Sequence, residues 1–130
     1  MSDSLERLYQ AVTAARTADP ASSRTARLLR AGRGKMAKKL AEEAVEVVID
    51  SMQGDTHAVV RESADLLYNL VVLWVASDVQ PKDVWTEMER RERLLGIAEK
   101  LPKEVPKEGF DASLRRKVVA LDRSRVRKRR

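Results

Sequence analysis

The sequence has no cysteine, one histidine and few aromatic residues, and each of these shortages excludes a class of protein. Without cysteine there is no disulfide, no thiolate nucleophile and no cysteine-ligated zinc or iron–sulfur centre. A lone histidine, His57, excludes a metal site built from several imidazoles. Because five glycines and four prolines supply little turn chemistry for many short strands, the composition favours helices.

Long apolar segments are also lacking. The first ten residues are polar and have no apolar centre of the kind found in signal peptides. The longest unbroken apolar run, residues 70–76, is far too short to span a bilayer. We therefore expect a cytoplasmic protein with no membrane segment, and 130 residues are enough for one hydrophobic core.

The net charge of +6 is concentrated at the C-terminal end. Residues 115–130 contain nine Lys or Arg and one Asp, a net charge of +8, so the preceding 114 residues together carry −2. A Pro-rich, charged segment, LPKEVPKEG, comes before this basic end and has no helical periodicity. We predict an all-α domain over residues 1–101, followed by a charged linker and basic tail over residues 102–130.

Apolar periodicity and turn residues predict five helices before that boundary, the second of which is a short helix or a turn. Ser22 or Ser23 caps the second helix, Gly54 ends the third, and Asp55 or Thr56 caps the fourth. Asp78 is expected to cap the fifth helix. The predicted ranges are 4–16, 25–30, 35–53, 56–77 and about 81–95. The third and fourth helices should form an antiparallel hairpin.

At 100° per residue, six charged side chains of the predicted helix 35–53 fall within about one quarter of its circumference, and four of them are acidic. These side chains are Lys35, Lys39, Glu42, Glu43, Glu46 and Asp50. The adjacent face is apolar and comprises Met36, Leu40, Ala44, Val47 and Val48. Val45 and Ile49 extend that face beyond what one hairpin partner covers, which predicts a subunit interface.

The helix predicted over 56–77 carries a second polar stripe, formed by Glu62, Asp65 and Asn69. Apolar neighbours such as Leu66 and Val72 predict that this stripe faces inward. Carboxylates are costly to bury unless a positive partner is present. Mg²⁺ meets the requirement, because it prefers oxygen ligands and is usually bound by carboxylates together with substrate phosphates. The pattern therefore predicts metal-assisted hydrolysis of a nucleotide pyrophosphate bond.

An alternative explanation for the acidic face is an ordinary surface in which Lys38 pairs with Glu42 and Lys39 with Glu43. It does not account for Asp65, which lies within a nearly continuous apolar run despite Arg61 four residues before it. A different class of function is nucleic-acid binding through the basic tail. We consider it the less favoured, because no aromatic residue lies between the tail's basic ones.

The spacing of Glu43-x-x-Glu46, fifteen residues, then Glu62-x-x-Asp65 resembles the metal-binding signature of the all-α, MazG-type nucleotide pyrophosphohydrolases. Within that superfamily, three segments are similar to the phosphoribosyl-ATP pyrophosphohydrolase family. They are SSRTARLLRAGRGKMAKKLAEEAVEVVIDSMQGD, RESADLLYNLVVLW and DVQPKDVWTEMERR. The similarity covers roughly residues 5–100.

The resemblance implies Mg²⁺-dependent hydrolysis of phosphoribosyl-ATP to phosphoribosyl-AMP and pyrophosphate, the second step of histidine biosynthesis. It also implies an obligate dimer, in which antiparallel helical hairpins pack into a four-helix-bundle-like homodimer or a higher homo-oligomer. The implied metal ligands are Glu42, Glu43, Glu46, Glu62 and Asp65, with catalytic roles for Glu43 and Glu46. The implied substrate contacts are Lys35, Lys38, Lys39, Arg24 and Asn69. The family usually has histidine where this chain has Asn69, so another nucleotide specificity within the superfamily stays open.

Overall fold

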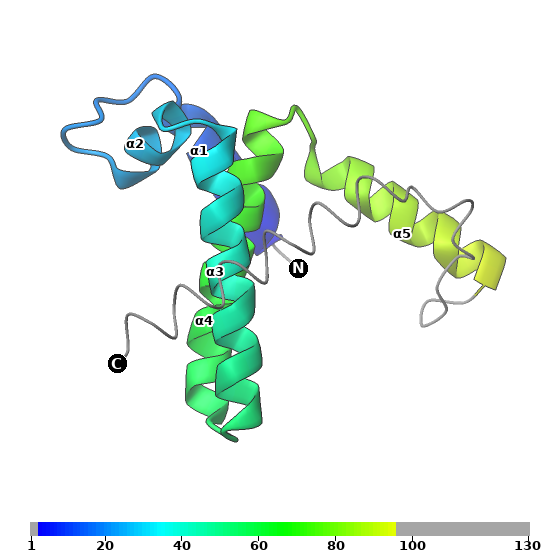
Figure 1. Cartoon of the computed structure of the whole chain (residues 1–130). Coiled ribbons are helices and arrows are strands. Elements are labelled where there is room, and N and C mark those ends of the chain that lie inside the picture. Colours follow the sequence, from blue (N-terminus) through cyan, green and yellow to red (C-terminus); the bar gives the residue numbers. More distant parts are fainter. Residues whose placement is uncertain (1–2, 96–130) are drawn as a thin grey trace. The chain divides into compact units, whose positions relative to one another are not determined.

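The computed structural model describes residues 3–95, which form five helices and no strand. The helices are α1 (Ser4–Ala15), α2 (Arg24–Arg30), α3 (Arg33–Met52), α4 (Thr56–Ala76) and α5 (Pro81–Leu95) (Figure 1). The all-α prediction is confirmed over this range. The chain divides into two compact units between Asp78 and Val79, so α5 is described by itself. The predicted linker and basic tail, 102–130, lie outside the described residues.

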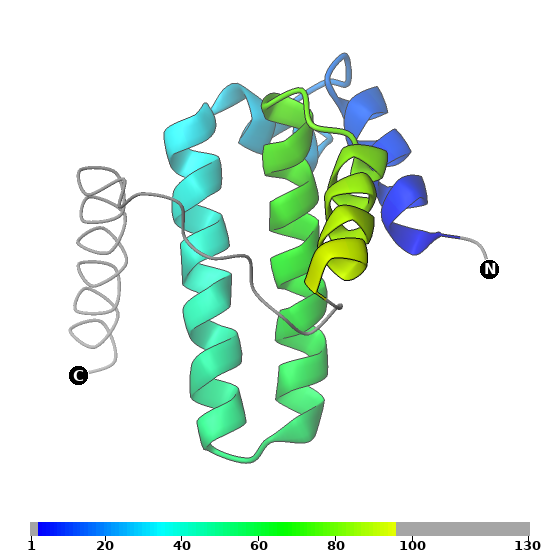
Figure 2. The same cartoon turned by 90° about the vertical axis from the view of Figure 1, so that its right-hand side faces the viewer.

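Helices α3 and α4 lie side by side and antiparallel, as Figure 2 shows. The turn between them is made by a glycine with a left-handed backbone, Gly54, at φ 72°. Its N–H donates to the Ser51 carbonyl and the Asp55 N–H to the Asp50 carbonyl, both at 3.1 Å. These two bonds form a Schellman motif, which satisfies carbonyls at the end of α3 and favours glycine at this position. The predicted hairpin and its stop signal are confirmed.

Side-chain caps fix where three of the helices begin. The Ser23 hydroxyl accepts from the Ala26 N–H at 3.1 Å, and the Asp55 carboxylate from the Ala58 N–H at 3.0 Å. Asp3 caps α1 in the same way. These bonds select Ser23 and Asp55 from the predicted pairs of candidates. Each cap satisfies an N–H group that the first turn of a helix leaves unpaired.

The prediction that Asp78 caps α5 is wrong. Helix α5 begins at Pro81, and the Gln80 N–H in front of it donates to the Asp83 carboxylate at 2.9 Å. Asp78 instead has a left-handed backbone, φ 56°, directly after the last residues of α4. Its carboxylate lies 3.8 Å from the Arg16 guanidinium, which also donates to the Val75 carbonyl. Asp78 therefore belongs to the end of α4.

The hydrophobic core lies where α1 and α2 pack against the N-terminal part of α3 and the C-terminal part of α4. Its buried centre comprises Val12, Met36, Val71, Val72 and Val75. Leu8, Leu28 and Trp74 are partly buried against it. Trp74 thus packs against the core, and His57 is exposed.

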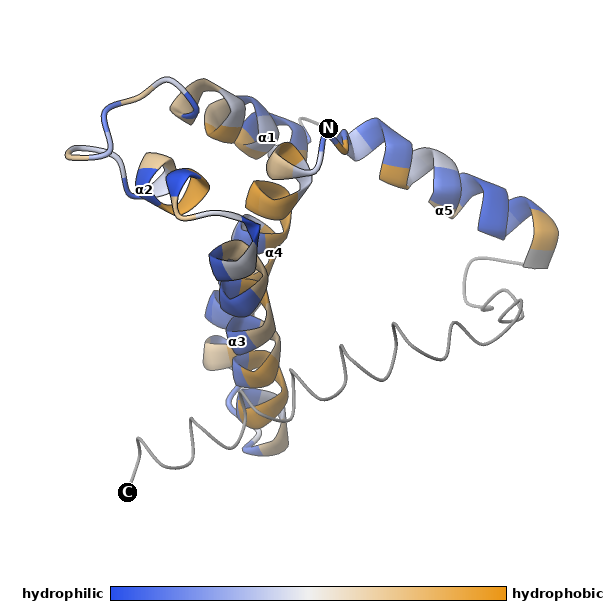
Figure 3. Cartoon of the chain, turned by 45° about the horizontal axis from the view of Figure 1, so that its top comes forward, coloured by the Kyte–Doolittle hydropathy of each residue, from blue (hydrophilic) through white to orange (hydrophobic). Residues whose placement is uncertain are grey.

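The far half of the hairpin, near the Gly54 turn, has little covering of its own. Val48 is 60% exposed, Met52 83%, Val60 64% and Leu67 42%. Val45 and Ile49, on the same apolar face as Val48, are half-buried. Figure 3 shows that apolar residues dominate α4. The hairpin therefore carries an uncovered apolar surface, defined here by Val48, Met52, Val60 and Leu67.

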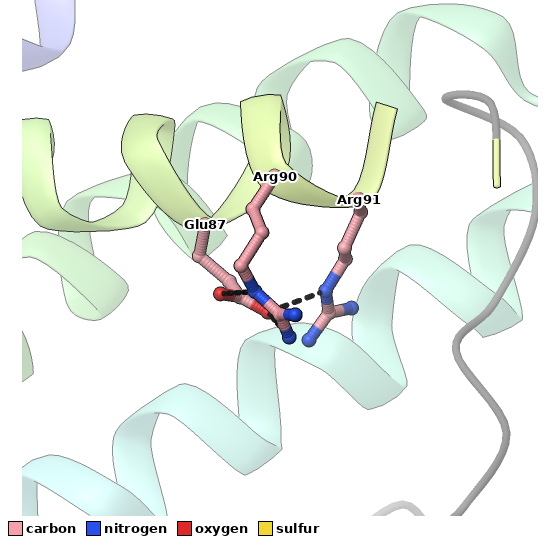
Figure 4. A network of polar contacts seen from close by, with 3 residues as sticks. All are labelled: Glu87, Arg90 and Arg91. Atoms are coloured by element: carbon pink, nitrogen blue, oxygen red, sulfur yellow. Dashed lines mark hydrogen bonds and ion pairs between the residues drawn. The ribbon is translucent and has the colours of Figure 1, made fainter. Parts of the chain in front are cut away.

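Helix α5 is mainly polar and contains its own ion-pair network. The Glu87 carboxylate accepts from Arg90 at 2.9 Å and from Arg91 at 3.0 Å, one turn further along the helix (Figure 4). These bonds, from Arg90 and then Arg91, lower the pKa of Glu87 from 4.5 to about 2. Within residues 3–95, no helix combines the length and apolar character needed to cross a bilayer.

Candidate metal centre and adjoining pocket

Carboxylates from α3 and α4 converge between the two helices. One oxygen each from Glu43, Glu62 and Asp65 lie within 4.8 Å of one another. A second group of the same closeness contains Glu46, Asp50 and Glu62. Glu62 belongs to both groups, so the five carboxylates form one continuous acidic cluster.

The antiparallel hairpin explains why residues far apart in the sequence meet here. On α3, Glu43, Glu46 and Asp50 are three and four residues apart, so they share one face. On α4, Glu62 and Asp65 are three residues apart and share a face in the same way. Because α4 runs back along α3, the middle of one helix faces the middle of the other. The spacing of the carboxylates along each helix, combined with the antiparallel pairing, therefore brings Glu43, Glu46, Glu62 and Asp65 together.

Glu62 contributes a buried carboxylate oxygen to this cluster. Its Oε2 atom is buried and has no hydrogen-bond partner. A buried carboxylate oxygen without a donor loses its hydration and gains nothing in return. Since the oxygens around it belong to other carboxylates, the donor set suits a hard cation with oxygen ligands.

The burial of the cluster is uneven. Glu43, Glu46, Asp50 and Glu62 are half-buried, whereas Asp65 is exposed. The expectation that the whole α4 stripe faces inward is therefore wrong at Asp65 and right at Asn69, which is 6% exposed. Asp65 lies at the open edge of the cluster, where a ligand from solvent can reach it.

The two lysines of the surface ion-pair alternative differ in their exposure. Lys38 is exposed and Lys39 is half-buried.

A pocket of about 280 Å³ adjoins the acidic cluster, between α2, α3 and α4. Four of its lining residues are cationic: Arg24, Arg27, Lys35 and Lys39. Leu28, Ala31, Tyr68 and Asn69 complete it. None of these described lining residues is acidic, so the pocket is suited to an anion.

Two hydrogen bonds hold lining residues of this pocket in place. The Tyr68 and Thr25 hydroxyls lie 2.7 Å apart and join α4 to α2. The Asn69 amide donates to the Asp65 carbonyl at 2.8 Å, which holds the side chain against its own helix. The amide oxygen of Asn69 still has acceptor capacity, but an amide, unlike an imidazole, does not titrate.

Most, but not all, of the residues predicted for the site come together. Glu42 is outside both carboxylate groups and Lys38 does not line the pocket. Two residues were missed as contributors, Asp50 and Arg27. Asp50 was recognised on the acidic face but not as a ligand, although it lies four residues after Glu46. The position of Arg27 in the chain gave no indication that it lines the pocket, because α2 meets α3 and α4 only through tertiary packing.

Comparison with known proteins identifies the family. The model of the phosphoribosyl-ATP pyrophosphohydrolase family matches residues 5–92. A protein of Bradyrhizobium diazoefficiens named phosphoribosyl-ATP pyrophosphatase 2 is 66% identical over 133 aligned positions, covering 99% of each chain. One of the same name from Rhodopseudomonas palustris is 63% identical and covers 100% of each chain.

A more distant relative, phosphoribosyl-ATP pyrophosphatase of Granulibacter bethesdensis, is 54% identical over 96 positions, covering 74% of this chain and 60% of its own. The C-terminal segment is thus included in the alignments with the first two relatives, although the family model ends at residue 92. The matched range contains α1 to α4 with the acidic cluster and the pocket. The chain belongs to the phosphoribosyl-ATP pyrophosphohydrolase family.

Proposed function

We propose that this protein hydrolyses phosphoribosyl-ATP to phosphoribosyl-AMP and pyrophosphate, the second step of histidine biosynthesis, with Mg²⁺ held by the acidic cluster. Family membership supports the reaction. The observation that carries the assignment to a site is the convergence of Glu43, Glu62 and Asp65 within 4.8 Å. A cytoplasmic location is part of the same proposal.

The residues of the cluster fit a magnesium ion by their chemistry. The ligands we propose are Glu43, Glu46, Glu62 and Asp65, with Asp50 completing the second group and Glu42 retained from the family resemblance. The buried, unpartnered Oε2 of Glu62 supports this assignment, because a cation would supply the missing partner. When bound, the ion would neutralise phosphate oxygens and acidify a coordinated water.

The chain's own residues would bind the substrate, position it and accept a proton. We assign Glu43 and Glu46 to catalysis, because a carboxylate beside the scissile phosphate can accept the proton of the attacking water. Lys35, Lys39 and Arg24 would contact phosphate oxygens from the adjoining pocket. Lys38 is exposed outside the pocket and would contribute only to the surrounding positive field.

A second specificity is favoured by one residue. Asn69 is buried, lines the pocket and holds the place where the family usually has histidine. If the side chain at this position contacts the nucleotide and sets the specificity, another nucleoside triphosphate would be the better substrate. Nucleic-acid binding through the basic tail remains the least favoured function, because the acidic cluster has no role in it.

We also propose that the protein works as a homodimer in which two α3–α4 hairpins form a four-helix bundle. The uncovered apolar surface supports this, because Val48, Met52, Val60 and Leu67 would be buried by a second hairpin. Asp65, exposed in one chain, would then lie closer to protein.

The test is a panel of nucleotides assayed for released pyrophosphate and orthophosphate in the presence of Mg²⁺. We expect pyrophosphate, and not orthophosphate, from phosphoribosyl-ATP. Glu46→Gln should abolish release while helix content and melting temperature stay close to those of the wild type. Deletion of residues 111–130 should leave activity intact.

The panel separates the three functions. Faster pyrophosphate release from another nucleoside triphosphate would assign the protein to that substrate. Absence of hydrolysis with every nucleotide, together with nucleic-acid binding that is salt-dependent and lost on truncation, would replace the enzyme by a binding module.

A further inference from the structure

The basic pocket lies directly beyond the acidic cluster on both helices of the hairpin. On α3, Lys39 precedes Glu43 by four residues, one helical turn. On α4, which runs the opposite way, Asn69 follows Asp65 by four residues. Four residues correspond to about 6 Å along a helix axis. A ligand that crosses the cluster therefore enters the pocket after one turn.

The positive charge of the pocket indicates which part of a nucleotide it can bind. About 280 Å³ of space is lined by four cationic residues, Arg24, Arg27, Lys35 and Lys39, and otherwise by Leu28, Ala31, Tyr68 and Asn69. Cationic groups in this number match a compact polyanion better than a sugar or a base. Arginine adds planar pairs of N–H donors, which match the oxygens of a phosphate.

In a nucleoside triphosphate, the two phosphates beyond the scissile bond are the part closest to that bond and the most highly charged. The 5-phosphate of the phosphoribosyl arm is also anionic, but the adenine ring and a ribose separate it from the triphosphate. With the scissile anhydride at the carboxylate cluster, a site one turn away is within reach of the β- and γ-phosphates. The phosphoribosyl phosphate would be much further along the substrate.

We propose that the pocket formed by Arg24, Arg27, Lys35 and Lys39 is the subsite of the leaving pyrophosphate. The inference rests on the proposed function and adds to it which half of the substrate the pocket takes. Water adds to the α-phosphorus, the bond from that phosphorus to the oxygen bridging it to the β-phosphorus breaks, and pyrophosphate departs with the bridging oxygen and its electron pair. One proton of the water goes to a carboxylate of the cluster.

Arg27 is the residue that this proposal adds to the site. One of its guanidinium nitrogens donates to the Pro20 carbonyl at 2.8 Å, which orients the side chain and leaves further N–H donors for a ligand. Tyr68 acts as a positioning residue, because its bond to Thr25 holds α2, and with it Arg24 and Arg27, against α4.

Product inhibition by pyrophosphate tests the proposal in the full-length enzyme with Mg²⁺. Lys35→Ala and Arg27→Ala should each raise the inhibition constant for inorganic pyrophosphate by about tenfold or more, the effect of losing one charge-assisted hydrogen bond. The inhibition constant for phosphoribosyl-AMP should change less than twofold. Arg27→Lys should recover part of the loss.

Matched controls come from the same two helices. Arg33→Ala on α3 and Arg30→Ala on α2 remove an exposed cation that does not line the pocket, and both should leave pyrophosphate inhibition unchanged. Lys35 is exposed, so its variant separates ligand binding from the structural role of Arg27, whose guanidinium donates to the Pro20 carbonyl.

Two results would overturn the assignment. Weaker inhibition by phosphoribosyl-AMP with unchanged pyrophosphate inhibition would place the nucleotide half in the pocket. Unchanged inhibition by both products would remove the pocket from the site. If the wild type hydrolyses no nucleotide, the proposed function fails, and calorimetric titration of wild type and Lys35→Ala with pyrophosphate and Mg²⁺ then decides the pocket separately: equal affinities overturn it.

Discussion

The hydroxyl groups of Thr25 and Tyr68 lie 2.7 Å apart and connect the seven-residue helix α2 to the middle of α4. A helix this short is not stable alone and depends on its tertiary contacts. This bond therefore helps to keep the cationic side chains of α2 at the pocket.

Removal of that bond should weaken both substrate binding and the fold. We expect Tyr68→Phe and Thr25→Val each to cost about 1 kcal/mol of unfolding free energy and to raise KM several-fold. Since both variants remove the same bond, their double variant should cost less than the sum of the two. Denaturant unfolding and steady-state kinetics measure both effects. Tyr9→Phe on α1 is the control, and additive losses would contradict the coupling.

Glu62→Gln should separate metal binding from folding. The substitution removes one charge shared by both carboxylate groups, so the repulsion within the cluster falls and the metal-free protein should be at least as stable as the wild type. Hydrolysis should fall by about two orders of magnitude or more, in line with loss of a metal ligand or its close support. In thermal melts, Mg²⁺ should raise the melting temperature of the wild type but not of the variant. An equal shift in both proteins would exclude Glu62 as a ligand.

Arg16→Ala should destabilise the contact between α1 and the end of α4. The guanidinium donates to the Val75 carbonyl and lies 3.8 Å from Asp78, so it places a cation at the C-terminus of a helix. We expect a loss of about 1–2 kcal/mol in chemical denaturation, most of it from the carbonyl contact because Asp78 is exposed. Asp78→Asn should therefore cost much less. Similar losses in the two variants would show that the ion pair dominates.

The carboxyl group of Glu87 should titrate far below ordinary glutamates. Its pKa is lowered from 4.5 to about 2 by hydrogen bonds from Arg90 and Arg91. Because the folded value is the lower one, the stabilisation is present above pH 4.5 and is lost as the pH falls toward 2. NMR titration of the carboxyl carbon measures this directly. In the Arg90→Ala, Arg91→Ala double variant the midpoint should return toward 4.5, and an unchanged midpoint would assign the shift to another cause.

A charge on the uncovered apolar surface should dissociate the proposed dimer. Leu67→Glu places a carboxylate where a second hairpin would pack, since Leu67 is 42% exposed in one chain. We expect light scattering to give the mass of a dimer for the wild type and of a monomer for the variant at micromolar concentration. Gln10→Glu adds the same charge to an exposed position of α1 and should remain dimeric. A monomeric wild type would refute the proposal.

Several features of the fold and the site were predictable because they depend on local sequence. The helices of residues 3–95, the Gly54 stop and the Asp55 cap follow from periodicity and capping rules, which act over one or two turns. The spacing of Glu43 and Glu46, and of Glu62 and Asp65, places each pair on one helix face for the same reason. Antiparallel pairing then brings the two pairs together with little further information.

Other features depended on contacts between residues distant in the sequence. Three contacts require the packing of α1 and α2 against the hairpin. They are the position of Arg27 in the pocket, the hydrogen bond between Thr25 and Tyr68, and the ion pair between Arg16 and Asp78. The same packing decides that the core fills one end of the hairpin, so that Val48 is exposed and Asp65 lies at an open edge. The order of the residues is enough to show which carboxylates share a helix face, because a helix repeats every 3.6 residues. Which of these carboxylates are buried, and which cations adjoin them, depends on the packing of distant segments, because burial depends on what the rest of the chain covers.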